Sequence, residues 1–272
     1  MELLFSAGKI ALGVAIGLPL LVYFLQDRIL FQTRPLTEAQ RVDAGKGFRS
    51  TREILIQAKD GTRLQAWHVD AGAGAPLVLY FGGNAEDVSW MISDAEQKVP
   101  GESWLLVSYR GYGGSEGSPS EASLTADALE WHDYAVKTLK PSRVFAFGRS
   151  LGSGVAVALA AERPLAGVVL VTPYDSLVEV AGRIYPYLPV GLLMKHRFDS
   201  IARAPKISAS LLCLAAEQDE VIPPVHAKRL YDAWAGPKQW VALPGAGHNS
   251  TDGVPAFWTE IRKFLGNRHG TA

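Results

Sequence analysis

The sequence has 272 residues, 48% of them hydrophobic and 20% charged, and its 27 basic and 27 acidic side chains leave a formal net charge of zero. A chain of this length can bury a hydrophobic core that is stable without disulfides or bound metals. Because it has neither net positive charge nor a run of Lys or Arg, it is not expected to bind nucleic acid. The single cysteine, Cys213, excludes an intramolecular disulfide scaffold and a CxxC zinc site.

The first predicted element is an apolar helix. Every residue at positions 10–25 is apolar, Gly or Pro, and only Glu2 and Lys9 are charged before it. These sixteen residues span about 24 Å as a helix, short of a hydrocarbon core of ~30 Å, but the segment is long enough if it begins at residue 3 and Lys9 reaches the membrane surface. We therefore expect an uncleaved, single-pass membrane anchor at residues 1–28, with residues 3–25 in the lipid bilayer.

Two other interpretations of this segment stay open, a cleaved signal peptide and an amphipathic helix that lies on the folded domain. No basic region precedes the apolar run and no small-x-small cleavage site follows it, which favours the anchor. Basic residues after the run outnumber Lys9, so the positive-inside rule weakly favours a cytoplasmic location for the rest of the chain.

Residues 29–272 are predicted to form one domain in which strands and helices alternate. Segments 53–58 and 62–69 flank an Asp-Gly turn and predict an antiparallel hairpin. Short apolar runs follow and indicate strands of a parallel sheet buried on both faces, at residues 76–81, 104–109, 143–147, 167–171, 211–216 and 239–243. Segments of helical character lie between them, at residues 87–98, 121–139, 151–162, 225–234 and 255–265. This order predicts an α/β fold with a mostly parallel eight-stranded sheet and helices on both faces.

One connection, at about residues 173–205, is too long for an ordinary loop between strands. It is rich in apolar residues, and two interpretations stay open. It forms either a core-packing crossover helix with a long loop, or a small cap over the site whose apolar face lines an acyl pocket. In the second case the candidate substrate-binding residues are Tyr185, Leu188, Leu192 and Met194.

The pentapeptide G-x-S-x-G occurs twice, so its context must decide between the two serines. Ser115 lies in loop composition several residues after its strand, and we interpret it as a turn residue. The motif that contains Ser150, residues 148–152, follows the apolar run at residues 143–147 directly and opens into a helix of small residues. Such a tight strand-turn-helix strains the central residue and points its Oγ out at the carboxyl edge of the sheet. Ser150 is therefore the predicted nucleophile.

A serine hydroxyl needs a base within hydrogen-bond reach and an acid that orients the base. His248 is the only one of six histidines that directly follows the last strand, in a glycine-rich loop, and it is the predicted base. Asp219 follows the preceding strand and is the predicted acid, with Asp175 as the runner-up. Ser150, Asp219 and His248 appear in the chain order of an α/β-hydrolase triad.

Backbone N–H groups are the predicted oxyanion donors. The N–H of Leu151 lies at the start of the helix after the nucleophile, and the N–H of Asn84 lies in the Gly82-Gly83-Asn84 loop after the third strand. The alternative for the second group is a plain Gly-Gly turn in which Asn84 caps the following helix.

These segments together resemble the α/β-hydrolase superfamily, and more closely its membrane-anchored branch of lysophospholipases and protein depalmitoylases. The resemblance extends over the whole chain and rests on QDRILFQTRP, YFGGNAED, SYRGYGGSEGSPSE, GRSLGSG, EQDEVIPPVHAKRLY and PGAGHN. It implies the fold and the triad but no particular substrate, because similar proteins include esterases, thioesterases and peptidase-like hydrolases.

The sequence departs from this family pattern at two places. Gly82 stands where similar proteins usually have His, which puts the rigidity of the oxyanion loop in question. Ser108 stands where they usually have Asp, so Arg110 needs another partner if it pairs with that acid in them.

The predicted function is that of a membrane-tethered serine hydrolase that cleaves ester or thioester bonds of small acyl or lipid-like molecules through an acyl-serine intermediate. A metal motif such as HExxH is not present, so the sequence implies no cofactor. One alternative is a serine aminopeptidase-like hydrolase, which needs an anionic group for the amino terminus of its substrate; Glu86, Asp87 and Glu179 are the candidates. The other alternative is a non-catalytic membrane scaffold, which is expected to lack a triad member.

Overall fold

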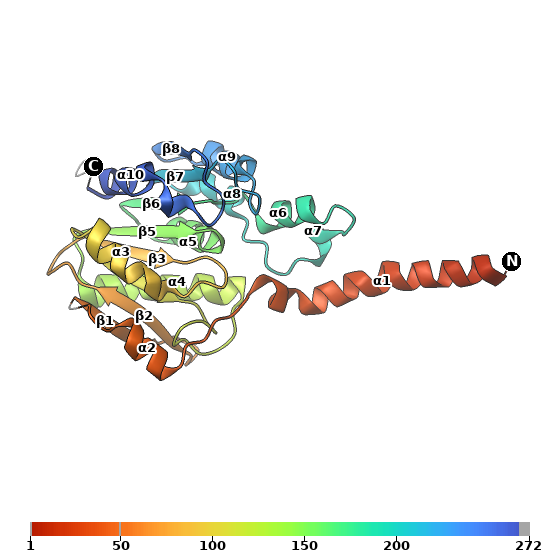
Figure 1. Ribbon diagram of the computed structural model, residues 1–272, viewed down its shortest axis with the longest axis horizontal. Coiled ribbons are helices and arrows are strands. Elements are labelled where there is room, and N and C mark those ends of the chain that lie inside the picture. The colour runs from red at the N-terminus through yellow and green to blue at the C-terminus, as the bar shows by residue number, and fades with distance from the viewer. Residues whose placement is uncertain (1, 49, 267–272) are drawn as a thin grey trace.

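The computed structural model describes residues 2–48 and 50–266, and its centre is one eight-stranded sheet in the order β1-β2-β4-β3-β5-β6-β7-β8 (Figure 1). β2 pairs antiparallel with both β1 and β4, and the remaining pairs are parallel. The strands are β1 (Thr51–Gln57), β2 (Arg63–Val69), β3 (Leu77–Phe81), β4 (Ser103–Ser108), β5 (Val144–Arg149), β6 (Gly167–Val171), β7 (Ser210–Ala216) and β8 (Lys238–Leu243). The predicted mostly parallel eight-stranded sheet is confirmed.

Helices cover both faces of this sheet. On one face lie α4 (Glu121–Tyr134), α5 (Leu151–Glu162) and α9 (Pro224–Ala233), and on the other lie α3 (Met91–Lys98) and α10 (Pro255–Gly266). Successive residues of a strand point to opposite faces. In β3, Leu79 and Phe81 therefore join one buried cluster, whereas Val78 and Tyr80 join the other. This double burial explains why the central strands are continuous apolar runs.

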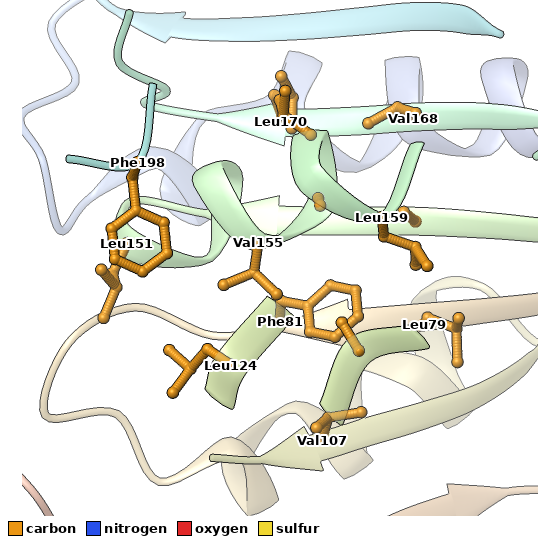
Figure 2. Close-up of a cluster of buried hydrophobic side chains, with 14 of the residues drawn as sticks. Leu79, Phe81, Val107, Leu124, Leu151, Val155, Leu159, Val168, Leu170 and Phe198 are labelled. Atoms are coloured by element: carbon orange, nitrogen blue, oxygen red, sulfur yellow. The ribbon is translucent and has the colours of Figure 1, made fainter. Parts of the chain in front are cut away.

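The cluster on the α5 face positions the turn between β5 and α5. Val155 and Leu159 of α5 lie against side chains of the strands, with Leu124 of α4 beside Phe81 (Figure 2). α5 is buried from Leu151 to Leu159, and its many small residues let its backbone approach the sheet closely. The start of α5 is thereby held against the carboxyl ends of β3 and β5.

We call the long connection after β6, residues 173–205, the cap segment. It contains α6 (Leu177–Ile184), α7 (Val190–Leu193) and α8 (Ser200–Arg203). The two ends of the segment pack into the core through Leu177 and Phe198, whereas none of the four residues of α7 is buried. In Figure 1, α6 and α7 project from the body toward the N-terminal helix.

The N-terminal helix α1 (Glu2–Leu30) extends far from the body (Figure 1). Among the helices in the described residues, none is long and apolar enough to cross a membrane. The predicted single-pass anchor, with residues 3–25 in a bilayer, is therefore wrong. The physical reason is the length of the apolar run, because about 24 Å of helix between Lys9 and Gln26 falls short of a ~30 Å hydrocarbon core.

Several smaller elements complete the chain. The helix predicted at residues 87–98 begins as a short 3-10 turn, η1 (Val88–Trp90), before α3. The helix predicted at residues 121–139 is α4 followed by a π-helical turn, η2 (Ala135–Leu139). The remaining elements are α2 (Glu38–Ala44), η3 (Ala204–Lys206) and η4 (Thr251–Gly253).

Candidate active site

Ser150 occupies the turn between β5 and α5, in a strained backbone conformation with φ 51° and ψ −118°. The two glycines around it are required by close packing. A Cβ on Gly148 would collide with the backbone of Gly152, and a Cβ on Gly152 would collide with the carbonyl oxygens of Phe81 and Gly82. The local sequence therefore forces the turn that presents the Ser150 hydroxyl at the carboxyl edge of the sheet.

The structure places His248 and Asp219 beside this hydroxyl. Nε2 of His248 lies 2.9 Å from Oγ of Ser150, and Nδ1 of His248 lies 2.7 Å from Oδ2 of Asp219. The other carboxylate oxygen of Asp219 accepts hydrogen bonds from the backbone N–H groups of Val221 and Ile222, at 2.9 and 2.7 Å. With Asp219 as acceptor, the proton of a neutral imidazole belongs on Nδ1, which leaves Nε2 free to accept the serine proton.

The oxyanion loop, residues 82–85, lies next to the nucleophile. A Cβ on Gly83 would be 3.6 Å from Cβ of Ser150. The N–H of Asn84 donates to no group among residues 2–48 and 50–266, and the N–H of Leu151 is the first of α5 and has no partner within that helix. Both predicted oxyanion donors are thus available near Ser150.

The side chain of Asn84 is used for another purpose than the helix cap considered above. Its Oδ1 accepts hydrogen bonds from the backbone N–H of Gln32 at 2.9 Å and from the hydroxyl of Tyr112 at 2.8 Å. The N-cap of η1 is instead Asp87, whose carboxylate accepts from the N–H of Ser89. The Asn84 side chain therefore ties the loop to the segment that follows α1.

A cavity of about 490 Å³ opens over the nucleophile. Its lining includes Ser150 and His248, together with the oxyanion-loop residues Gly83 and Asn84. Sequence reasoning considered Glu86 only for the aminopeptidase alternative, and it did not assign five further lining residues to the pocket: Trp90, Arg149, Val221, Asn249 and Asp252. Arg149 could have been found from its position inside the G-x-S-x-G motif, whereas the others carry no comparable signal.

The four cap residues expected to bind substrate do not line this cavity. Tyr185 and Leu188 line a second, apolar groove of about 500 Å³ that they share with Leu18 of α1. Leu192 is 88% exposed, and Met194 packs against the core. The structure thus separates these cap residues from the cavity at Ser150.

The other candidate nucleophiles and acids have structural partners. Ser115 is buried; its Oγ donates to the carbonyl oxygen of Ser108 and accepts from the N–H of Gln65. Asp175 pairs with Nδ1 of His226 at 2.7 Å. Burial in β7 raises the pKa of the Cys213 thiol, so this cysteine is not an alternative nucleophile.

Arg110, which needed a new partner because position 108 is Ser, pairs with two carboxylates. Its Nε and Nη2 donate to Asp127 of α4 at 2.8 and 2.7 Å, and Nη1 donates to Asp60. Ser108 instead donates to Oε1 of Gln65 at 2.6 Å. The loop after β4 is therefore anchored by a buried ion pair.

Known proteins resemble this chain in sequence and in fold. A family model described as the alpha/beta hydrolase fold matches residues 76–191. An uncharacterized protein of Mycobacterium tuberculosis, Rv2307c, is 38% identical over 266 residues, which cover 93% of this chain and 91% of the relative. The lysophosphatidylserine lipase ABHD12 of Danio rerio is 28% identical over 95% of this chain and 77% of the lipase.

A solved structure extends the comparison to three dimensions. The esterase Pf2001 of Pyrococcus furiosus superposes with a TM-score of 0.70 over 86% of this chain and 95% of the esterase, at 17% sequence identity. Such a likeness shows a shared fold.

Proposed function

The chain belongs to the α/β-hydrolase superfamily, in its branch of α/β-hydrolase-domain proteins, and on this basis we propose that it is a serine hydrolase of carboxylic esters or thioesters. One observation carries the proposal. The hydroxyl of Ser150, the imidazole of His248 and the carboxylate of Asp219 form a continuous chain of contacts of 2.9 and 2.7 Å at the cavity. This arrangement activates a serine for attack on an acyl carbon.

The chemistry proceeds in two halves. Oγ of Ser150 attacks the carbonyl carbon while Nε2 of His248 takes its proton, and the N–H groups of Asn84 and Leu151 stabilise the negative charge on the former carbonyl oxygen. The tetrahedral intermediate then expels the alcohol or thiol, which receives the proton from His248. A water molecule attacks the acyl-serine in the same way and releases the carboxylic acid. Throughout, Asp219 orients the ring and stabilises its protonated form.

The ester or thioester assignment is supported over an aminopeptidase by the state of the three carboxylates considered for that role. Glu86 accepts three hydrogen bonds from its own surroundings, Asp87 caps η1, and Glu179 lies 3.6 Å from the guanidinium of Arg229. Of the three, only Glu86 lines the cavity with Ser150, and both of its oxygens already accept hydrogen bonds. The relative named as a lysophosphatidylserine lipase also favours an acyl ester as substrate.

Labelling with a fluorophosphonate probe tests this function, with Ser150→Ala, His248→Ala and Ser115→Ala beside the wild type. We expect Ser150→Ala to abolish labelling and His248→Ala to reduce it strongly. Ser115→Ala should keep it, because Ser115 is a buried structural residue. A series of p-nitrophenyl esters from short to long acyl chains then defines the acyl preference. A folded wild type that neither labels nor hydrolyses any ester would contradict the proposal and favour the scaffold alternative.

A further inference from the structure

We propose that Glu86 is a positioning residue that holds the oxyanion loop, residues 82–85, in its working conformation, a role that rests on the proposed hydrolase function. Its carboxylate occupies the space that a side chain at position 82 would need, and it ties the loop both to β3 and to the wall of the cavity.

The carboxylate of Glu86 is fully engaged. Oε2 accepts the backbone N–H of Gly83 at 2.6 Å, and Oε1 accepts the hydroxyl of Tyr80 at 2.5 Å and the indole Nε1–H of Trp90 at 2.9 Å. Burial and then the charge of Glu86 raise the pKa of Tyr80, so the Tyr80 hydroxyl keeps its proton and donates. Hydrogen bonds to a charged acceptor are stronger than neutral ones, which favours a fixed loop.

The glycine at position 82 is explained by the same carboxylate. An added Cβ would lie 2.9 Å from Cδ of Glu86 and 3.0 Å from Cγ1 of Val88. Gly82 is not among the residues with positive φ, so its backbone does not demand glycine. The carboxylate of Glu86 instead occupies the space beside Gly82. Its hydrogen bonds can therefore hold the oxyanion loop rigid although glycine stands where similar proteins have histidine.

These contacts also decide which N–H group of the loop faces the substrate. The N–H of Gly83 donates to the carboxylate of Glu86, whereas the N–H of Asn84 has no acceptor among the described residues and can donate to an oxyanion. From the other side, the hydroxyl of Tyr109 donates to the carbonyl oxygen of Gly82 at 2.9 Å, and Tyr112 donates to the Asn84 side chain. The loop is thus fixed at three successive residues. Glu86 supplies a charged contact inside it, and the guanidinium of Arg34 supplies another at its end by donating to the carbonyl oxygen of Ala85 at 3.4 Å.

Glu86 also connects the loop to the wall of the cavity. The oxygen that accepts from Tyr80 also holds the indole of Trp90, and the guanidinium of Arg149 lies 5.7 Å from the centre of a Trp90 ring. Glu86, Trp90 and Arg149 all line the cavity with Ser150. A change at Glu86 therefore reaches the oxyanion loop and the residue next to the nucleophile.

Glu86→Gln is the sharpest test because it keeps the size of the side chain. If the amide oxygen stays with Tyr80 and Trp90, the NH₂ group faces the N–H of Gly83, and two donors oppose each other. We expect kcat for a p-nitrophenyl ester to fall about 10- to 100-fold with KM within about 2-fold, because the loss is confined to the transition state. The rate constant of fluorophosphonate inactivation should fall in parallel.

Asp87→Asn is the matched control. It removes the neighbouring negative charge but keeps an N-cap, since Asn caps as well as Asp. We expect kcat to change by less than about 2-fold. Gly82→Ala should lower kcat by displacing the carboxylate, and it should have little further effect when combined with Glu86→Gln.

Amide hydrogen exchange of residues 82–85 reports the tether without any substrate. We expect faster exchange at the Gly83 amide in Glu86→Gln than in the wild type or Asp87→Asn. Unchanged exchange, or an active wild type whose kcat survives Glu86→Gln, would overturn the proposal, and so would a rise in KM alone. A wild type that neither labels nor hydrolyses, but whose exchange depends on Glu86, would overturn the proposed function and with it the catalytic role of the tether.

Discussion

At the carboxyl edge of the sheet, hydrogen-bond contacts link the side chains of the proposed catalytic set to one another, whereas few contacts hold the outer part of the cap segment. Asp219 accepts two backbone N–H groups in addition to the His248 ring. In the cap segment, by contrast, Tyr187 is 97% exposed and Leu192 is 88% exposed. The geometry for breaking a bond is therefore built into the loops of the sheet, and the exposed outer part of the cap segment lies outside it.

The cap segment is held from outside by a latch of five residues. The amide of Gln26 donates to the carbonyl oxygen of Leu193 and accepts from the N–H of Lys195. Asp27 lies 2.9 Å from Nε2 of His196, whose Nδ1 accepts from the N–H that begins α4. Gln26 and His196 are each 8% exposed, but the side chain of Asp27 is half exposed, and partly exposed polar contacts are worth less than a buried core. The two regions should accordingly respond to substitution in different ways.

The largest effect is expected from Asp219→Asn. The new NH₂ group would face Nδ1 of His248, which moves the ring proton to Nε2, so the ring could no longer accept the proton of Ser150. We expect kcat to fall about 10⁴-fold with little change in the free energy of unfolding. Steady-state rates and urea unfolding measure the two quantities.

Asp175→Asn is the matched control, because Asp175 forms the other buried Asp–His pair, with His226. Here we expect the opposite pattern, with lower stability and kcat within about 3-fold of the wild type. If Asp175→Asn instead lost activity as severely as Asp219→Asn, the assignment of the acid would have to be reversed.

The second largest effect is expected on stability, from the buried ion pair between Arg110 and Asp127 that anchors the loop after β4. Arg110→Met leaves the Asp127 carboxylate, which is 6% exposed, without its partner. We expect a loss of about 3 kcal/mol in the free energy of unfolding, because an uncompensated charge would remain buried. Urea unfolding monitored by fluorescence measures it.

Arg63→Met is the comparison for this prediction. Arg63 and Glu116 also form an ion pair, but both side chains are more than half exposed. Its loss should cost less than about 1 kcal/mol. Equal losses in the two variants would mean that burial of the Arg110 pair contributes nothing to the rigidity of the catalytic edge.

The sequence predicted those features that depend on neighbours in the chain. The strand at residues 76–81 was visible as an apolar run because both faces of β3 are covered, and the position of Ser150 followed from a motif that packing enforces. The order of Asp219 and His248 along the chain indicated that they meet at one edge, and the structure brings them within hydrogen-bond distance of each other. The assignment of catalytic roles to them stays a prediction.

Features that depend on distant partners could not be predicted in the same way. The role of Glu86 depends on Tyr80 and Trp90, which only the fold brings to its carboxylate. The first helix was interpreted as a membrane anchor from its composition alone, although Gln26 at its end is engaged with the cap segment 167 residues away. Hydrophobicity also could not show that a cap residue such as Leu192 faces solvent and not the cavity.

The smallest effect is expected from Gln26→Ala, which removes one arm of the latch. The carbonyl oxygen of Leu193 and the N–H of Lys195 lose their partner but lie close enough to the surface to bind water. We therefore expect less than about 1 kcal/mol of lost stability, an unchanged kcat for a short-chain ester, and faster hydrogen exchange at residues 193–196. Gln32→Ala is the control, because among the described residues Gln32 bonds through its backbone N–H alone. A large fall in kcat for Gln26→Ala would break the comparison between the two regions, because it would mean that the latch helps to set the geometry at Ser150.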